Sequence, residues 1–281
     1  MKNNQNKISR TMKNILANYF SILLSKSHYF VTLSRLIIKY SDNDCNEDMS
    51  KNGEKKILEY LIIHNLSDVI FDIGANHGDY IAMIPELKNQ LIYAFEPGLR
   101  NLEILQKNTS NRHDINIIPY ALSSAERVVD FYEHTDLELA GSDSIHDMHN
   151  IGYESKTIIY SVKARTLDNI CNEKGIKHIN FIKCDVEGNE LAVFKGSARM
   201  LEAGQIDFIQ FEFGHAARAA HVFLYDIVDY FHCYNYKIFI IKPKGLKHFN
   251  YTPWEENKYN MANFLAVKNE RVSVLERIII D

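Results

Sequence analysis

The chain has 281 residues, of which 46% are hydrophobic and 24% charged, and its formal net charge is -4. This composition predicts one globular domain with a modest appendage, large enough to bury a core without disulfides or structural metals. Nucleic-acid binding would require a basic face, so the acidic balance argues against a nucleic-acid partner.

The N-terminal segment is apolar but interrupted by charge. Residues 14–38 read NILANYFSILLSKSHYFVTLSRLII, with Lys26 and Arg35 inside the run. It falls short of the roughly 20 apolar residues that span a bilayer, and it lacks the small-residue cleavage site of a signal peptide. We expect an amphipathic helix that packs on the main domain or on a sister subunit in a homo-oligomer. Contact of residues 14–40 with a membrane surface is the less favoured alternative.

The next residues predict a linker. Residues 41–56 (SDNDCNEDMSKNGEKK) are polar and contain no aliphatic run. We therefore expect an N-terminal helical extension with its linker over residues 1–55 and the globular domain over residues 56–281. The four cysteines form no CxxC pair, which indicates reduced thiols and a cytoplasmic location.

From Lys55 onward, apolar runs alternate with helical patterns. Several runs are continuously apolar, as in parallel strands covered by helices on both faces. The alternation predicts a doubly wound, mostly parallel, seven-stranded α/β sheet, whose ligands bind at the carboxyl ends of the strands. The predicted strands are 69–74, 91–97, 115–123, 180–188, 206–213, 236–243 and 263–269, and the predicted helices are 54–65, 77–88, 98–109, 189–203 and 217–233.

Residues 124–170 break this alternation. The runs RVVDFYEH and KTIIYSVKA are typical of extra strands, and they flank the polar stretch AGSDSIHDMHNIGYES. We expect an inserted hairpin or lid near the ligand site.

The first predicted strand ends in an acid followed by a glycine turn. Asp72 precedes Gly74, Asn76 and Gly78, and glycine lets backbone N–H groups approach a ligand. A dinucleotide fingerprint needs Gly-x-Gly-x-x-Gly, but this chain has Asn76 and Asp79 at the second and third glycine positions. An acid before the turn also opposes a pyrophosphate and favours a ligand with a positive end, such as the amino group of a methionine moiety.

The second predicted strand ends at Glu96. A carboxylate there can accept hydrogen bonds from both hydroxyls of a ribose. Each feature alone is typical of an ordinary turn or a solvated acid. Together in one strand–helix–strand unit, Asp72, the glycine turn and Glu96 indicate S-adenosylmethionine.

Ionisable residues also gather at two later strand ends. Strand periodicity predicts that Lys183, Asp185 and Glu187 point the same way, and Glu212 and His215 follow the next strand. Such groups at the end of a buried strand need a partner or a ligand. A structural network is a credible role for Lys183 and for Glu187, but not for all three acids Asp185, Glu187 and Glu212.

These motifs resemble the FkbM-type methyltransferases. The resemblance rests on FDIGANHGDY, YAFEPGLRNLEIL, ALSS, TLD, FIKCDVEGNELAVFKGS and IQFEF, and it covers about residues 68–215. It implies a class I, Rossmann-like S-adenosylmethionine-dependent fold and methyl transfer to oxygen, on hydroxyls of sugars or natural products. It adds Leu122 and Ser123, in ALSS, to the residues expected at the cofactor. Asn189 stands where the family usually has a small residue.

A sugar hydroxyl is a poor nucleophile, so the reaction needs a base or a metal. The candidate bases are Asp185, Glu187, Glu212 and His215, with Lys183 beside them. The alternative is Mg²⁺ held by Asp185 and Glu212 with help from Glu187.

The sequence thus predicts an O-methyltransferase that modifies a sugar hydroxyl in a glycan, glycolipid or natural-product precursor. Two alternatives remain at this point. One is a nucleotide-sugar oxidoreductase or epimerase on a Rossmann sheet, which the broken glycine pattern opposes. The other is a non-catalytic scaffold with a methyltransferase fold, which the joint presence of Asp72, Glu96, Asp185 and Glu212 opposes.

Overall fold

The computed structural model describes residue 21 and residues 28–136, 141–152, 155–257 and 261–280. The chain forms two compact units, residues 1–44 and residues 45–281. In the first unit, helix α2 spans His28–Asp42; most of the predicted apolar segment before it lies outside the described residues. No helix among the described residues is both long enough and apolar enough to cross a bilayer.

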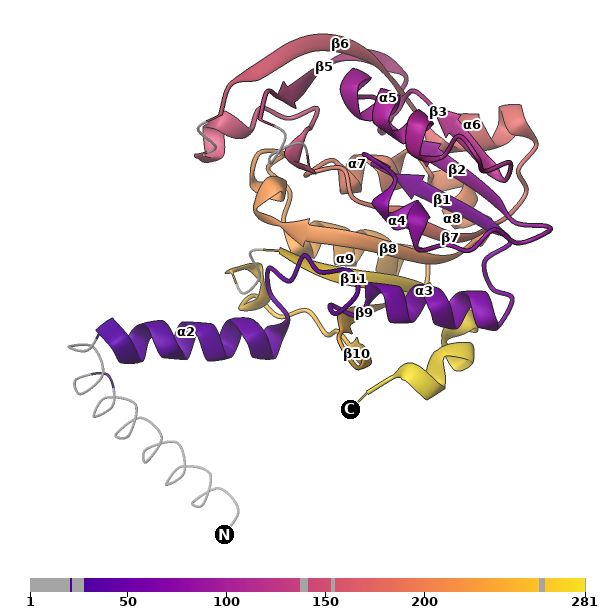
Figure 1. The fold of residues 1–281 in the computed structure, drawn as a ribbon. Helices are drawn as coiled ribbons and strands as arrows, with labels where there is room; N and C mark the ends of the chain where they lie inside the picture. Colours follow the sequence, from indigo (N-terminus) through magenta and orange to yellow (C-terminus); the bar gives the residue numbers. More distant parts are fainter. Residues whose placement is uncertain (1–20, 22–27, 137–140, 153–154, 258–260, 281) are drawn as a thin grey trace. The chain divides into compact units, whose positions relative to one another are not determined.

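The second unit is built on one twisted sheet (Figure 1). Its strand order is β10-β9-β11-β8-β7-β1-β2-β3, with parallel pairing from β8 to β3 and antiparallel pairing of β11 and β10 with their neighbours. The strand bounds are β1 Val69–Ile73, β2 Leu91–Phe95, β3 Ile115–Ile118, β7 Ile179–Cys184, β8 Ile206–Gly214, β9 Tyr236–Lys242, β10 Gly245–His248 and β11 Met261–Lys268.

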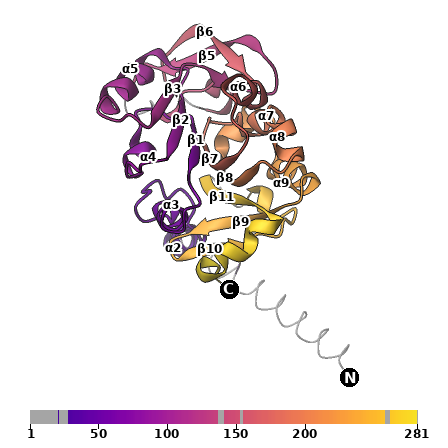
Figure 2. The ribbon, with the colours of Figure 1, turned by 90° about the vertical axis from the view of Figure 1, so that its right-hand side faces the viewer.

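Helices cover both faces of this sheet (Figure 2). One face carries α3 Glu54–Ile63, α4 Asp79–Ala82 and α5 Leu99–Asn108, and the other carries α6 Leu167–Lys174, α7 Glu190–Lys195, α8 Ala198–Glu202 and α9 Leu224–Cys233. Each face has its own hydrophobic core, because successive strand residues point to opposite sides. The doubly wound, mostly parallel α/β class is confirmed.

The predicted elements differ from the structure in several bounds. The sheet has eight strands rather than seven, because the short β10 pairs with β9. The single strand predicted over 115–123 is divided at Pro119, which cannot donate a ladder hydrogen bond, into β3 and the separate β4 (Ala121–Leu122). The helix predicted over 77–88 is only the four-residue α4, since Pro85 follows it. The helix predicted over 189–203 is interrupted between α7 and α8.

The helix predicted over 217–233 is confirmed only in its second part, by α9. The described residues also form the 3₁₀ helices η2 Met148–Ile151, η3 His215–Arg218, η4 Glu255–Asn257 and η5 Asn269–Ile278.

The insertion forms a second, smaller sheet. Strand β5 (Arg127–His134) pairs antiparallel with β6 (Thr157–Arg165), and β4 pairs parallel with β6. The predicted hairpin is therefore present, with a third strand. Phe131, Val162 and Ala164 form its small apolar core with Ala121.

The predicted linker is wrong in its second half. The compact unit begins at Cys45, and Asn52 and Glu54 are buried. Gly53 fits tightly against the sheet, since a Cβ there would lie 2.3 Å from the carbonyl oxygen of Lys242. Residues 45–54 are thus part of the globular unit, because their polar side chains find buried partners in it.

The core on the α7–α9 face is centred on aromatic contacts. The ring of Phe211 in β8 is fully buried and lies 5.4 to 5.7 Å from the rings of Phe194, Phe231 and Phe264. The carboxyl end of β8 therefore has a rigid support on this face.

Substitution Phe211→Ala should lower the free energy of unfolding by about 3–5 kcal/mol, because it leaves a cavity among three rings. Urea denaturation followed by circular dichroism measures this change. The matched control is Phe223→Ala, at a ring that is 63% exposed, which should change stability by less than about 0.5 kcal/mol. Equal losses in both variants would contradict the assignment of this core.

Candidate active site

The turn after β1 approaches the end of β7 closely. Gly74 has φ 82°, and a Cβ on it would lie 1.8 Å from the carbonyl oxygen of Asp185. Only glycine allows this contact. Two residues further on, Asn76 also has a positive φ of 46°. The N–H groups of Gly74 and Ala75 donate to the carbonyl oxygen of Phe95, and that of Asn76 donates to Glu96. The turn is therefore held against the ends of β2 and β7, and whether its backbone meets a ligand stays a prediction.

Glu96 is fixed at the end of β2 by backbone donors. The N–H of Asn76 donates to its Oε2 at 2.8 Å, and the N–H of Gly98 donates to its Oε1 at 2.8 Å. Each oxygen keeps further acceptor capacity, because a carboxylate offers about four lone-pair sites. Burial raises the pKa of Glu96 to about 7, although the two backbone donors act to lower it.

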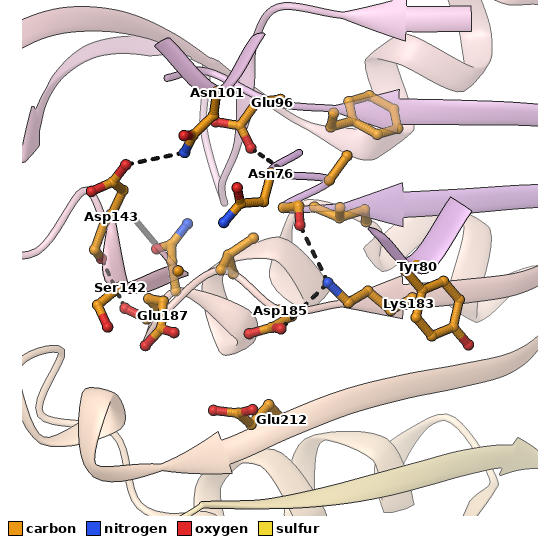
Figure 3. A pocket seen from close by; sticks show the side chains of 18 of the residues that line it. Asn76, Tyr80, Glu96, Asn101, Ser142, Asp143, Lys183, Asp185, Glu187 and Glu212 are labelled. Carbon is orange, nitrogen blue, oxygen red and sulfur yellow. Dashed lines mark hydrogen bonds and ion pairs between the residues drawn. The ribbon is translucent and has the colours of Figure 1, made fainter. Parts of the chain in front are cut away.

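A cavity of about 560 Å³ opens between these elements and the insertion. Figure 3 shows Glu96 and Asn101 on one side of it, Glu212 on the other side, and Asp185 and Glu187 between them. This volume is within the range of small-molecule sites. Of the residues singled out in the sequence, Gly74, Asn76, Glu96, Leu122, Lys183, Asp185, Glu187, Glu212 and His215 line it.

Three predicted cofactor residues do not line this cavity. Asp72 is fully buried below it, Gly78 faces Leu105 of α5, and the Ser123 side chain is fully buried. The expectation that the Asp72 carboxylate meets the ligand directly is not supported by this geometry. Asp72 instead belongs to an ion-pair network beneath the turn.

The centre of that network is Lys183. Its register on β7 sets it beside Asp72 on β1, and its Nζ lies 3.7 Å from Asp72 Oδ1 and 3.3 Å from Asp185 Oδ2. The same Nζ donates to the carbonyl oxygen of Gly74 at 3.2 Å. Figure 3 shows the Lys183 side chain directed at Asp185. Lys183 thus connects both strand ends and the glycine turn.

The network sets the charges of its members. Burial acts to lower the pKa of Lys183, but the surrounding carboxylates outweigh it, so the net shift is upward and the ammonium persists. Burial raises the pKa of Asp72 to about 6 despite the opposing effect of Lys183. A structural role for Lys183, one of the two roles that the sequence allowed, is therefore what its contacts indicate.

Three carboxylates meet beside this network. One oxygen from each of Asp185, Glu187 and Glu212 lies within 4.8 Å of the other two. Burial and the neighbouring carboxylates raise the pKa of both Glu187 and Glu212 well above the usual range. Such a group can share protons or hold a hard divalent cation. Contrary to strand periodicity, β7 ends at Cys184, so Asp185 and Glu187 extend from the loop.

The insertion contributes Asp143, which the sequence analysis missed. Asp143 accepts from Asn101 Nδ2 at 3.0 Å and from the N–H of His134 at 2.7 Å, and Arg100 lies 3.5 Å away. Burial raises its pKa to about 6. Ser144 Oγ donates to the carbonyl oxygen of Glu187 at 2.8 Å. The polar GSDS stretch in the insertion was the available signal.

A second group of polar residues was also missed because it lies in the supposed linker and inside strands. Glu54, at the start of α3, accepts from Asn263 at 3.0 Å and also from Gln210 and Asn52. Asn263 is paired in register with Glu212 on the neighbouring strand. Since Glu54, Glu212 and Asn263 all line the cavity, this side of it is rich in hydrogen-bonding groups.

The sheet order, the glycine turn with Glu96, and the strand-end carboxylates together have the arrangement of the class I methyltransferase fold. The chain belongs to the FkbM methyltransferase family, because the model described as "Methyltransferase FkbM domain" matches residues 72–238. That match lies within residues 45–281 and includes the insertion, Glu96, and the cluster of Asp185, Glu187 and Glu212, but not Glu54.

Two curated proteins resemble the chain at low identity. The hexuronic acid methyltransferase AglP of Haloferax volcanii is 27% identical over 165 residues, covering 58% of this chain and 64% of that protein. The 2-O-methyltransferase NoeI of Sinorhizobium fredii is 26% identical over 187 residues, covering 63% and 75%. The chain therefore spans slightly less than two thirds of the length of AglP.

Among solved structures, the precorrin-6y C5,15-methyltransferase of Geobacter metallireducens aligns with a TM-score of 0.39 at 12% identity. The alignment covers 76% of this chain and 86% of that one.

Substitution Glu96→Gln should weaken binding of S-adenosylhomocysteine by roughly 10–100-fold, because one charged acceptor oxygen is lost. Wild-type affinity should also fall on the order of tenfold from pH 8 to pH 6, since the Glu96 carboxylate, with its pKa of about 7, takes up a proton and stops accepting. Isothermal titration calorimetry measures both effects. The control Glu103→Gln, at an exposed residue of α5, should leave affinity unchanged. A pH dependence that persists in Glu96→Gln would assign it to another group.

Proposed function

We propose that this protein transfers the methyl group of S-adenosylmethionine to a hydroxyl oxygen of a sugar in a glycan, glycolipid or natural-product precursor. The observation that carries the proposal is the position of three carboxylates beside the glycine turn, in one cavity with Glu96. The printed names of the two curated relatives, a hexuronic acid methyltransferase and a 2-O-methyltransferase, support a sugar hydroxyl as the acceptor.

The residues at the ends of β1 and β2 fit the methyl donor. Glu96 has free acceptor capacity for two ribose hydroxyls, and the turn from Gly74 to Asn76 lines the same cavity. The sulfonium of the donor supplies an already activated methyl group.

The opposite side of the cavity fits a polyhydroxylated acceptor. Glu212, Asn263 and Glu54 present carboxylate and amide groups there, and His215 lies at the rim of the same cavity. Sugars bind through many such hydrogen bonds, because a sugar hydroxyl that is buried without a partner lowers the binding affinity. The acceptor hydroxyl would then lie near Asp185 and Glu212.

The partners of the three carboxylates distinguish their roles. Burial and the neighbouring carboxylates raise the pKa of Glu187 and Glu212, which favours their protonated forms as hydrogen-bond donors to acceptor oxygens. Asp185 differs from them in having a cationic partner, since its Oδ2 lies 3.3 Å from Lys183 Nζ. We assign Asp185 as the base that takes the proton of the acceptor hydroxyl.

Alignment of the acceptor oxygen with the methyl group and sulfur can supply about 7–11 kcal/mol of the barrier reduction. A positioned base adds roughly 10²–10⁴-fold. Positioning is therefore the larger contribution, and loss of the base leaves a slow but measurable reaction.

The variants Asp185→Asn and Glu212→Gln test this assignment. Asp185→Asn should lower kcat by roughly 10²–10⁴-fold, whereas Glu212→Gln, which keeps a donor, should lower it by less than about tenfold. Methyl transfer from labelled S-adenosylmethionine to a screened panel of glycans gives the rates. Both variants should bind S-adenosylhomocysteine with nearly wild-type affinity. A larger loss in Glu212→Gln would make Glu212 the base, and donor binding without turnover of any acceptor would support the scaffold alternative.

The alternative with Mg²⁺ held by Asp185, Glu187 and Glu212 makes a different prediction. Because Lys183 already supplies a positive charge beside Asp185, the base mechanism needs no cation at this position. Incubation with EDTA followed by desalting should leave kcat unchanged. The metal mechanism would instead be supported if EDTA removed activity, if Mg²⁺ restored it, and if Mg²⁺ failed to restore it in Glu212→Gln.

A further inference from the structure

Helix α2 has one apolar side that is open to solvent. Its exposed large apolar residues recur at helical spacing: Tyr29, Phe30, Leu33, Leu36 and Ile37. Tyr29 is 71% exposed and Ile37 is 60% exposed. Residues three and four positions apart lie on one side of a helix, so these five form a continuous apolar stripe.

The opposite side of the same helix is polar and basic. Arg35 and Lys39 are four residues apart, lie about half a turn away from Leu33 and Ile37, and are both exposed, while Asp42 at the end of α2 is its one acid. The helix thus has two distinct sides, one aromatic and aliphatic and the other cationic.

Charge is unevenly distributed along the sequence. Residues 1–40 contain seven lysines and arginines and no aspartate or glutamate. The other 241 residues contain 25 lysines and arginines against 36 aspartates and glutamates. The net charge of -4 therefore conceals a strongly basic N-terminal segment joined to an acidic globular unit.

We propose that α2 docks on the surface of a lipid bilayer that contains anionic headgroups, with its apolar stripe facing the acyl chains and Arg35 and Lys39 near the phosphates. A helix with cations on its polar side and aromatic and aliphatic residues on the other is suited to this interface. Charge complementarity favours this occupant over a second copy of the chain, because residues 1–40 carry seven basic residues and no acid, so two such segments repel each other. The acidic globular unit is repelled by the same anionic headgroups, so the attachment is confined to the basic segment.

Vesicle sedimentation of the full-length protein tests this proposal. Sucrose-loaded vesicles of phosphatidylcholine with about 30% phosphatidylglycerol are compared with vesicles of pure phosphatidylcholine. The anionic lipid supplies the negative surface potential that attracts basic segments. The protein should sediment with the anionic vesicles and remain largely in solution with the neutral ones. Binding should weaken as salt is raised, because the cations are screened.

Three variants separate the contributions. Leu33→Ser with Ile37→Ser should lower partitioning on the order of tenfold or more through loss of apolar burial. Arg35→Gln with Lys39→Gln should lower it on the order of 20-fold on anionic vesicles and leave weak neutral binding unchanged. The matched control, Ile63→Ser with Val128→Ser, removes two exposed apolar residues from the globular unit and should have no effect.

S-adenosylhomocysteine titration verifies that each variant is folded, and it is independent of the vesicle result. Absence of sedimentation with either vesicle type would overturn the proposal. So would equal losses in the Ile63/Val128 control. Light scattering that shows a dimer dispersed by Leu33→Ser with Ile37→Ser, without vesicle binding, would assign the stripe to a second copy instead.

Discussion

The ammonium of Lys183 is the interaction on which the site depends. Parallel pairing of β1 with β7 sets Lys183 directly beside Asp72, and both side chains are buried. The same ammonium reaches Asp185 and the carbonyl oxygen of Gly74, so one cation fixes the ends of both strands and the turn between them. Loss of this cation would leave Asp72 as an uncompensated buried charge, which is strongly destabilising.

The carboxylates of the cavity differ in their partners and in the effect of burial on their pKa. Asp185 has a cationic partner, whereas Glu187 and Glu212 face other carboxylates, and burial raises their pKa. The three carboxylates of one cluster therefore have different surroundings and can take different roles toward a ligand. Glu96, farther along the cavity, accepts from two backbone N–H groups and retains capacity for a ligand.

The sequence predicted the sheet well because its strands are continuous apolar runs that end in Asp, Glu or Lys. It predicted Glu96, Asp185, Glu187 and Glu212 in one cavity because the ends of parallel strands share one edge. It could not predict that Asp72 lies beneath the cavity, since that depends on the register of β1 against β7.

Residues that depend on long-range pairing were also missed. Glu54 is in a polar stretch typical of a linker, and only its contacts with Gln210 and Asn263 bring it to the site. Asp143 reaches Asn101 through the fold of the insertion, which no local pattern encodes. The division at Pro119 follows a local rule, but the pairing of β4 with β6 does not.

The most direct test of this account is a calorimetric titration of the wild-type protein with S-adenosylhomocysteine and, separately, with NAD. The account predicts one S-adenosylhomocysteine site per chain with micromolar affinity and no heat from NAD, because we assign Glu96 and the turn at Gly74 to the methyl donor and the dinucleotide glycines are absent. Tight NAD binding without S-adenosylhomocysteine binding would contradict it.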